Sequence, residues 1–255
     1  MKRAIVTYAA DAHEELLDVV LPTYRTFAER HGYDLCVTRN DLVESLQYMP
    51  MANQLPPAWR KIPLLLEALS RYEEVVWFDC DLVVVDPRED FPPMVSDPTT
   101  GVFTQDKLHA LVRHFEDNSE VPNSGVWRLR RGMEPLLQKI LELEVFTDHG
   151  WWEQAALLTL MGYTVPPEGS EFPLTKCRCV HPTYWTRACQ FMRLKYNSHP
   201  NYRAEHPVIV HCSYPSMPQR LEVMRSLVKD PHFDYPRYDK AAEVEDDTKT
   251  VPALP

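Results

Sequence analysis

Two carboxylates interrupt an otherwise apolar run in residues 75–85, VVWFDCDLVVV. Residues 74–78 are almost continuously apolar, which is typical of a strand buried on both faces of a sheet. Asp79 and Asp81 follow at its carboxyl end, and residues two apart in an extended segment project to the same side. Because two buried carboxylates are costly without a cation, this segment predicts a strand whose end opens onto a ligand site.

Apolar periodicity around this strand predicts an α/β chain that opens with a β-α-β unit. The stop signal His31-Gly32 separates the first helix from the second strand, and Pro63 is tolerated in the first turn of the next helix. This order is the signature of a doubly wound sheet. The predicted strands are 4–7, 33–37 and 74–78, and the predicted helices are 14–30 and 61–72.

A second half begins after Pro92-Pro93. Residues 39–57 read as irregular, and residues 239–255 read as a flexible polar tail. The second half is predicted to contain strands 101–105, 125–129, 163–166 and 207–212, with helices 134–143 and 152–160.

The charge balance argues against two classes of partner. With 37 acidic and 27 basic residues the net charge is −10, so a basic surface for nucleic acid or anionic membrane is not expected. The amino terminus lacks a signal-peptide core, and no stretch approaches the roughly 18 apolar residues of a membrane helix. We therefore expect a cytoplasmic protein without a transmembrane segment and with six reduced cysteines. Cys177-Arg-Cys179-Val-His181 lacks the further pair that a zinc site needs.

The acidic pair and a late histidine predict a metal site. Asp79 and Asp81 offer hard oxygen ligands that suit Mn²⁺ or Mg²⁺. His211 also ends an apolar strand, and imidazole is a good third ligand for manganese. The alternatives are a solvated turn for the acidic pair and a structural role for the histidine.

Three further segments carry polar groups that suit a sugar phosphate. Glu153-Gln154 could bind sugar hydroxyls beside the platform of Trp151 and Trp152, or the carboxylate could simply favour the start of a helix. Asn123-Ser124-Gly125 is either a turn or a place where the backbone approaches a sugar closely. Lys61 either lies in solvent at the start of its helix or supplies a positive charge to a diphosphate.

The order and spacing of these segments resemble the galactosyl- and xylosyltransferases of the GMA12/MNN10 type, which are GT-A glycosyltransferases. The resemblance spans residues 3 to 215. The motifs that carry it are Trp59-x-Lys61, WFDCDLVV at 77–84, Asn123-Ser124-Gly125-Val126-Trp127-x-Leu129-Arg130, Trp152-Glu153-Gln154, Leu194-Lys195-Tyr196-Asn197 and Ile209-Val210-His211.

The resemblance implies a single GT-A domain over residues 1–238, with a Rossmann-like mixed sheet flanked by helices. Residues 1–100 would bind a nucleotide-sugar, usually a UDP-sugar, and residues 101–238 would bind the acceptor. Asp79, Asp81 and His211 would hold Mn²⁺. The remaining donor contacts would come from Thr7, Tyr8, Ala9, Lys61, Cys80, Asn123, Ser124, Gly125, Glu153 and Gln154.

The chain departs from the related families at several positions. Ser213 and Ser216 stand where a glycine and a lysine often help to hold the diphosphate, and Arg220 is the predicted substitute. Glu153 stands where the wider group frequently has aspartate, so the sugar preference does not transfer. Eukaryotic members carry a membrane anchor and stem, and their absence favours a bacterial-style cytosolic enzyme.

The reaction expected from the resemblance is transfer of a hexose, such as galactose or glucose, to a hydroxyl of a saccharide or small molecule with retention. Gln154 or Glu153 would then steady an oxocarbenium-like sugar, whereas in an inverting enzyme Glu153 would be the base. Trp151, Trp152, Tyr184 and Trp185 would offer stacking surface to the acceptor, or belong to the core.

Two other functions stay open at this point. The segment FDCDLV also resembles the nucleophile motif of haloacid dehalogenase phosphatases, in which Asp79 would be phosphorylated. That motif normally opens the chain, whereas two strands and two helices precede it here. The second alternative is a nucleotide or carbohydrate binding module without turnover.

Overall fold

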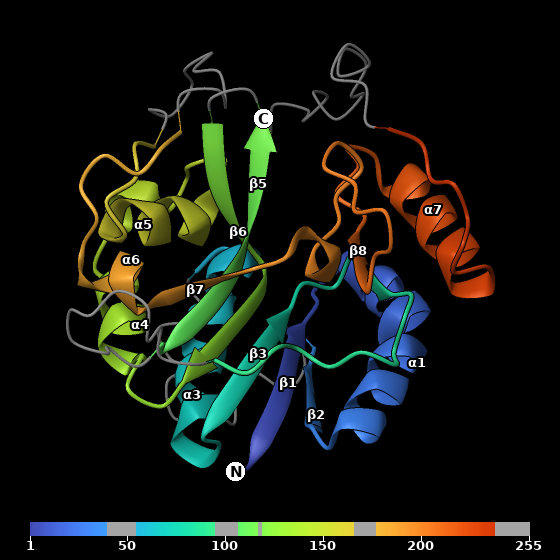
Figure 1. Cartoon of the computed structure of the whole chain (residues 1–255), viewed down its shortest axis with the longest axis horizontal. Helices are drawn as coiled ribbons and strands as arrows, with labels where there is room; N and C mark the ends of the chain where they lie inside the picture. Colours follow the sequence, from blue (N-terminus) through green and yellow to red (C-terminus); the bar gives the residue numbers. More distant parts are fainter. Residues whose placement is uncertain (40–54, 95–106, 117–118, 166–176, 238–255) are drawn as a thin grey trace, which may run out of the picture.

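The computed structural model describes residues 1–39, 55–94, 107–116, 119–165 and 177–237 (Figure 1). The strands of its main sheet run in the order β2(Asp34–Thr38), β1(Arg3–Tyr8), β3(Glu74–Phe78), β6(Ser119–Arg130), β5(His109–Glu116), β7(Cys189–Met192). β1 is parallel to β2 and β3, β6 is antiparallel to β3 and β5, and β7 is parallel to β5. The sheet is therefore mixed, as the sequence predicts.

Two short strands make a separate antiparallel ribbon. β4(Leu82–Val84) pairs with β8(Ile209–His211), so that Leu82 lies opposite His211. A further bond from the amide of Cys212 to the carbonyl of Asp81, at 2.9 Å, extends this pairing to the acidic segment. The ribbon thus brings residues about 130 positions apart in sequence to one place.

Helices cover both faces of the main sheet. α1(His13–His31) packs on one face, with α7(Met217–Lys229) against α1 and β4, and α3(Lys61–Arg71), α4(Glu134–Leu141) and α5(Trp152–Leu160) lie on the other face (Figure 1). The alternation along β3 explains both cores, because Val76 and Phe78 face the first group while Val75 and Trp77 face the second. The short helices are η2(Pro57–Arg60), η4(Glu144–Phe146), α6(Tyr184–Ala188) and η6(Leu194–Tyr196).

The first half of the chain matches its sequence prediction closely. The strand 74–78 and, later, the helix 152–160 have the predicted bounds, and the other elements up to residue 72 differ by one or two residues. Gly32 ends α1 with a φ of 70°, a conformation that suits glycine.

The second half contains most of the errors. The predicted strand 125–129 is part of the longer β6, and residues 163–165 form only an isolated bridge, between Tyr163 and Cys179, instead of the predicted strand 163–166. β5, β7, α6 and α7 were not predicted in this half, and β4 was not predicted in the first half. The predicted strand 101–105, the tail 239–255 and most of the irregular stretch 39–57 lie outside the described residues.

All six cysteines are free thiols in this structure, as predicted. Among the helices that the structure describes, none has both the length and the apolar composition required to cross a membrane.

Candidate functional site

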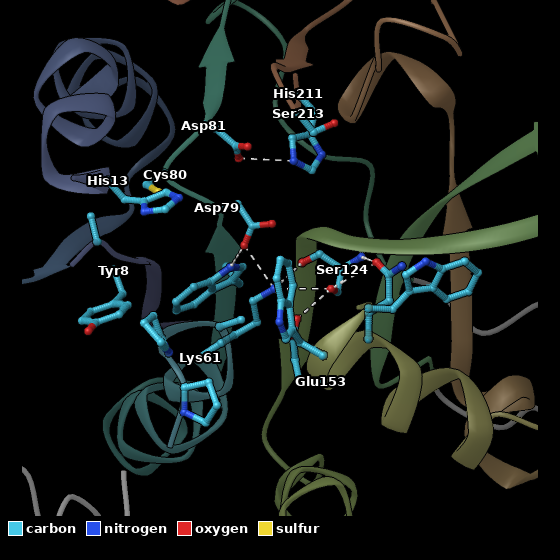
Figure 2. Close-up of a pocket in the computed structure, with 18 of the residues that line it drawn as sticks. Tyr8, His13, Lys61, Asp79, Cys80, Asp81, Ser124, Glu153, His211 and Ser213 are labelled. Atoms are coloured by element: carbon cyan, nitrogen blue, oxygen red, sulfur yellow. Dashed lines mark hydrogen bonds and ion pairs between the residues drawn. The ribbon is translucent and has the colours of Figure 1, made fainter. Parts of the chain in front are cut away.

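A cavity of about 470 Å³ opens where β3 ends (Figure 2). The acidic segment 79–81 lines it at the end of β3. Residues from the end of β1 and the start of α1 also line it, as do residues from β6 and the start of α5. Its lining residues are Tyr8, Ala9, Ala10, His13, Pro56, Pro57, Ala58, Lys61, Trp77, Asp79, Cys80, Asp81, Asn123, Ser124, Gly150, Trp151, Trp152, Glu153, Gln154, His211, Ser213 and Arg220.

Asp79, Asp81 and His211 meet in this cavity. Each offers one ligand atom, and these atoms all lie within 4.8 Å of one another. Asp79 directly follows β3, and Asp81 lies in the turn between β3 and β4. His211 is the last residue of β8, which pairs with β4. The predicted partnership of these three residues is therefore present in the geometry.

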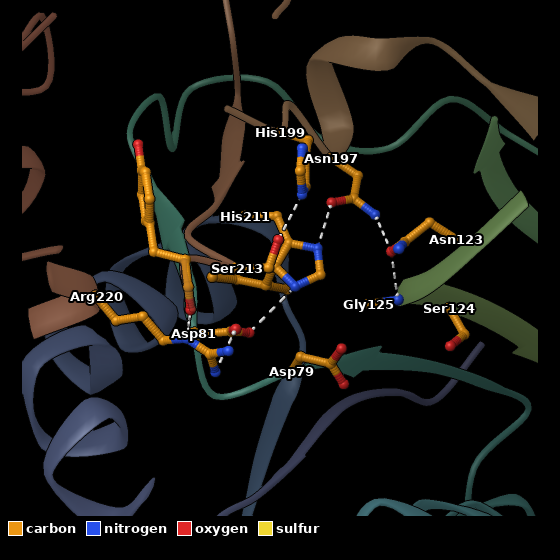
Figure 3. Close-up of polar contacts among 12 residues, drawn as sticks. Asp79, Asp81, Asn123, Ser124, Gly125, Asn197, His199, His211, Ser213 and Arg220 are labelled. Carbon is orange, nitrogen blue, oxygen red and sulfur yellow. Dashed lines mark hydrogen bonds and ion pairs between the residues drawn. The ribbon is translucent and has the colours of Figure 1, made fainter. Parts of the chain in front are cut away.

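Asp81 and His211 belong to a set that we call the histidine cluster, made of Asp81, Asn197, His211 and Arg220 (Figure 3). His211 Nε2 lies 3.2 Å from Asp81 Oδ1, and Arg220 Nη1 lies 3.5 Å from Asp81 Oδ2. Burial opposes ionisation of Asp81, yet His211 and Arg220 hold the pKa of that carboxyl well below its usual range. Burial would likewise lower the pKa of His211, and Asp81 raises it above its ordinary value.

Asp79 belongs to a different set, the lysine cluster, made of Lys61, Asp79, Ser124 and Glu153 (Figure 2). Lys61 Nζ lies 3.1 Å from Asp79 Oδ1 and 2.6 Å from Glu153 Oε1. The side chains of Lys61 and Glu153 are only 5% and 4% exposed. Burial alone would lower the pKa of Lys61, but the two carboxylates raise it above its ordinary value, so the ammonium stays charged.

Three further bonds orient the residues of the lysine cluster. Trp77 Nε1 donates to Asp79 Oδ1 at 2.5 Å, on the oxygen that also faces Lys61. Ser124 Oγ donates to Glu153 Oε1 at 3.0 Å, and the Ser124 amide donates to Gln154 Oε1 at 2.9 Å. Glu153 thus does more than favour the start of α5, because it is half of a buried ion pair.

Gly125 lies against the imidazole of His211. A Cβ at this position would be 2.6 Å from His211 Cε1 and 2.9 Å from Asn123 Oδ1. From the sequence, Gly125 was expected to lie in a turn or to let a sugar approach the backbone closely. In the structure its close neighbours are the side chains of His211 and Asn123. Glycine is required here so that the ring of His211 fits beside β6.

Trp151 and Trp152 form one margin of the cavity. Trp152 is 51% exposed and has a φ of 45°, which is unusual for a bulky residue. The bond from its amide to the carbonyl of His149, at 2.8 Å, supports this turn. A strained, exposed tryptophan beside a cavity is the arrangement expected of a ligand platform.

Some of the residues predicted for the site lie elsewhere. Thr7 is fully buried, and its side chain does not line the cavity, although its neighbours Tyr8 and Ala9 do. Tyr184 and Trp185 pack edge-to-face on each other and do not line the cavity either. Ser216, at the position of the expected lysine, caps α7 by accepting a bond from the amide of Gln219.

The sequence reading missed several residues that the structure brings to the site. Trp77 and Asn197 bond directly to proposed ligand side chains, and His13 lines the cavity. The alternation along β3 could have indicated Trp77. Asn197 was visible only as part of a motif, because its partners are far away in sequence.

The donor set fits a hard divalent cation. Two carboxylates and one imidazole are ligands that manganese accepts, and three protein ligands leave positions for other oxygens. Asp79 Oδ1 is occupied by Trp77 and Lys61, so its Oδ2 is the oxygen available to a metal.

No protein-family model matches the sequence, and no curated protein matches it. Solved structures are similar. A glycosyltransferase involved in the glycosylation of the major capsid of PBCV-1 has a TM-score of 0.58 at 15% identity, covering 89% of this chain and 100% of that chain. The galactosyltransferase LgtC, in complex with donor and acceptor sugar analogues, has a TM-score of 0.51 at 12% identity, covering 89% and 95%. The glycosyltransferase GlyE of Streptococcus pneumoniae TIGR4 has a TM-score of 0.54 at 16% identity, covering 92% and 61%.

At these identities the likeness concerns the fold. The mixed sheet with helices on both faces is the arrangement of GT-A glycosyltransferases, and the fold predicted from the resemblance is confirmed. The narrower resemblance to the GMA12/MNN10 type stays a prediction.

Proposed function

We propose that this chain is a metal-dependent glycosyltransferase that moves a sugar from a nucleotide-sugar to a hydroxyl group. The observation that carries the proposal is the convergence of Asp79, Asp81 and His211 in the cavity of a GT-A fold. In finer detail we propose a UDP-hexose donor, such as UDP-galactose or UDP-glucose, and a saccharide or small-molecule acceptor. The cytoplasmic location stays a prediction.

Asp79, Asp81 and His211 would hold Mn²⁺ or Mg²⁺. When bound, the cation neutralises the negative charge that develops on the departing nucleoside diphosphate. Arg220 also lines the cavity, with its guanidinium 3.5 Å from Asp81, and would replace the lysine that the related families place nearby. We propose that its guanidinium faces the diphosphate.

Tyr8, Ala9 and Cys80 would line the nucleotide end of the cavity. Thr7 would act through the backbone only, because its side chain is buried in the sheet. Lys61 would meet the sugar or hold the carboxylates around it. Its ammonium is already surrounded by Asp79, Glu153 and Ser124, which favours the second role over direct binding of phosphate.

The contacts of Glu153 favour transfer with retention of the anomeric configuration. Its carboxylate is buried, and Oε1 accepts bonds from both Lys61 and Ser124, so these contacts hold it beside β6. A base for an inverting reaction must reach the acceptor hydroxyl. We therefore propose that Glu153, with Asn123, Ser124, Gly125 and Gln154, positions the donor sugar.

Trp151 and Trp152 would form the acceptor platform, since both line the cavity and Trp152 is exposed. Tyr184 and Trp185 do not line it, so a role for them would require an acceptor that extends beyond the cavity.

A binding and hydrolysis experiment tests the proposal. Thermal stability is measured with Mn²⁺ and a panel of UDP-, GDP- and dTDP-sugars, with and without EDTA, and release of free nucleotide is followed by chromatography. A donor at 100 times its Kd should stabilise the fold by about 2.7 kcal/mol, in a metal-dependent way. We expect EDTA to abolish this effect, and D79N or D81N to reduce nucleotide release by about 100-fold or more.

The outcomes separate three possibilities. Metal-dependent stabilisation without nucleotide release, even with a broad set of saccharide acceptors, would indicate a binding module. If no nucleotide-sugar stabilises the protein, the proposed function is wrong. The control is R225M, which removes an exposed ion pair with Glu15, neither residue of which lines the cavity, and it should leave binding unchanged.

A further inference from the structure

A chain of hydrogen bonds links the backbone of β6 to the ring of His211 (Figure 3). The amide of Gly125 donates to Asn123 Oδ1 at 2.8 Å, and Asn197 Nδ2 donates to the same oxygen at 2.7 Å. Asn197 Oδ1 lies 3.1 Å from His211 Nδ1. Asn197 is fully buried, so these bonds are not exchanged with solvent.

The direction of every bond in this chain follows from its first member. A backbone amide can only donate, so the atom of Asn123 that faces Gly125 is the oxygen. The atom of Asn197 that faces this oxygen must then be its NH₂ group, which leaves the oxygen of Asn197 toward His211. Because that oxygen can only accept, His211 Nδ1 must carry the proton.

This assignment leaves Nε2 as the ring nitrogen that faces Asp81, at 3.2 Å. In the neutral ring Nε2 then has a lone pair directed at a carboxylate, and two acceptors at this distance need a cation between them. A proton or a divalent metal ion can fill that role. The ring is therefore presented to the proposed metal by the nitrogen that can bind it.

We infer that Asn197 is a positioning residue that fixes His211 as the Nδ1–H tautomer and so prepares Nε2 to bind the metal. The inference rests on the proposed function, because it assigns a role toward the same metal site. Partners of this kind on the far side of a metal-binding imidazole typically change metal affinity by 10- to 100-fold.

The backbone around Asn197 is also held from two sides. His114 Nε2 bonds to the carbonyl of Asn197 at 2.9 Å, and the amide of His211 donates to the carbonyl of Ser198 at 2.8 Å. The carboxamide therefore has little freedom to turn away from the imidazole. Ser198 is equally buried, but its hydroxyl bonds to Tyr235 and to the amide of Ala204 and takes no part in the chain to the His211 ring.

The first test needs no metal. The protein is labelled with ¹⁵N-histidine, and the ring nitrogens of His211 are observed by NMR at alkaline pH, where the ring is neutral. H211N identifies the signals by their disappearance. We expect the protonated nitrogen to be Nδ1, and observation of the Nε2–H tautomer would overturn the inference.

The second test measures Mn²⁺ affinity by electron paramagnetic resonance of the free ion. N197L removes the acceptor, and we expect at least 10-fold weaker binding together with loss of the single tautomer. N197D keeps an acceptor for Nδ1–H, so it should retain the tautomer and bind Mn²⁺ more tightly than N197L. S198A is the matched control, and its Mn²⁺ affinity and tautomer should equal those of the wild type.

The outcomes distinguish this inference from the proposed function. Wild-type Mn²⁺ affinity in N197L would overturn the role of Asn197 while leaving the metal site intact. If the wild type itself binds no Mn²⁺, the proposed function fails, and the tautomer measured without metal still decides whether Asn197 orients the ring. If N197L does not fold, the wild-type spectrum and N197D against S198A decide the question.

Discussion

The two aspartates of one short motif lie in different electrostatic surroundings. Asp79, in the lysine cluster, is 30% exposed at its side chain and shares Lys61 with Glu153. Asp81, in the histidine cluster, is 10% exposed and is balanced by His211 and Arg220. The lysine cluster has one cation for two carboxylates, whereas in the histidine cluster the cations at least match the single carboxylate.

This difference indicates that the two clusters have different dependence on a metal. In the lysine cluster the ammonium of Lys61 joins Asp79 Oδ1 to Glu153 Oε1. The histidine cluster uses the ring nitrogen that faces Asp81, so a metal must replace whatever proton lies there. We expect the lysine cluster to determine stability and the histidine cluster to determine metal affinity.

The largest expected effect comes from removing the shared cation. K61M leaves Asp79 and Glu153 without their positive partner in a buried position, and should lower the free energy of unfolding by about 3–5 kcal/mol. Urea denaturation measures it. The double variant K61M/E153Q should recover part of this loss, because one of the two unpaired charges is removed.

The control for this prediction is the exposed pair of Arg225 and Glu15, with side chains 58% and 57% exposed. R225M should change the free energy of unfolding by less than about 1 kcal/mol. If K61M is no more destabilising than R225M, the lysine cluster is not a stabilising network and the comparison fails.

A smaller effect is expected from G125A, which crowds the histidine cluster without touching the charges of the lysine cluster. The added methyl group would meet the ring of His211 at 2.6 Å, so the ring or β6 must shift. We expect a loss of about 1–3 kcal/mol in stability and about 10-fold in Mn²⁺ affinity, measured by denaturation and by titration.

Gly150 provides the matched control for G125A. It lines the same cavity, but a Cβ there would have no neighbour within 4 Å among the described residues. G150A should leave both quantities unchanged. Equal Mn²⁺ affinity of G125A and wild type would show that the position of the ring does not limit metal binding.

The smallest effect concerns pH and contrasts two buried histidines. Burial lowers the pKa of His114 to about 4, whereas Asp81 raises the pKa of His211 despite its burial. His114 takes up a proton below about pH 6.5 in the unfolded chain but not in the folded one, so its contribution to stability is lost as the pH falls from about 6.5 toward 4. His211 has the opposite sign, and its contribution is lost as the pH rises through its folded pKa.

H114Q separates the two histidines, since a glutamine amide can still donate to the carbonyl of Asn197. Between pH 6.5 and 5 the wild type should lose about 1–2 kcal/mol more stability than H114Q. Urea denaturation at both pH values measures this difference. Parallel pH dependence of the two proteins would contradict a neutral, buried His114.

The amino-terminal half of the fold was predictable because its elements are local and regular. β3 is apolar after its first residue, Glu74, and α1 ends at a glycine in the conformation that a helix end favours. The second half was less predictable from the sequence. β5 and β7 contain polar residues. The sequence of β6, SEVPNSGVWRLR, contains a proline and turn-forming residues. Such strands are stabilised by their neighbours in the sheet more than by their own composition.

The candidate site shows the same limit. Asp79, Asp81 and His211 could be proposed from their positions at strand ends, and the structure brings them together. The pairing of Lys61 with Glu153 could not be proposed from the sequence, because the two residues are 92 positions apart and neither alone indicates a partner. The role of Thr7 stays a prediction that concerns its backbone alone, because its side chain is buried while those of its neighbours line the cavity.

The β4–β8 ribbon has a consequence for the order in which the proposed metal site forms. During synthesis the acidic segment emerges about 130 residues before His211, so Asp79 and Asp81 are present long before the proposed third ligand. The site is complete only when the last strand has docked beside β4. A bound metal would then link the early and late parts of the chain, and the docked carboxyl-terminal segment should resist proteases better with Mn²⁺ than without it.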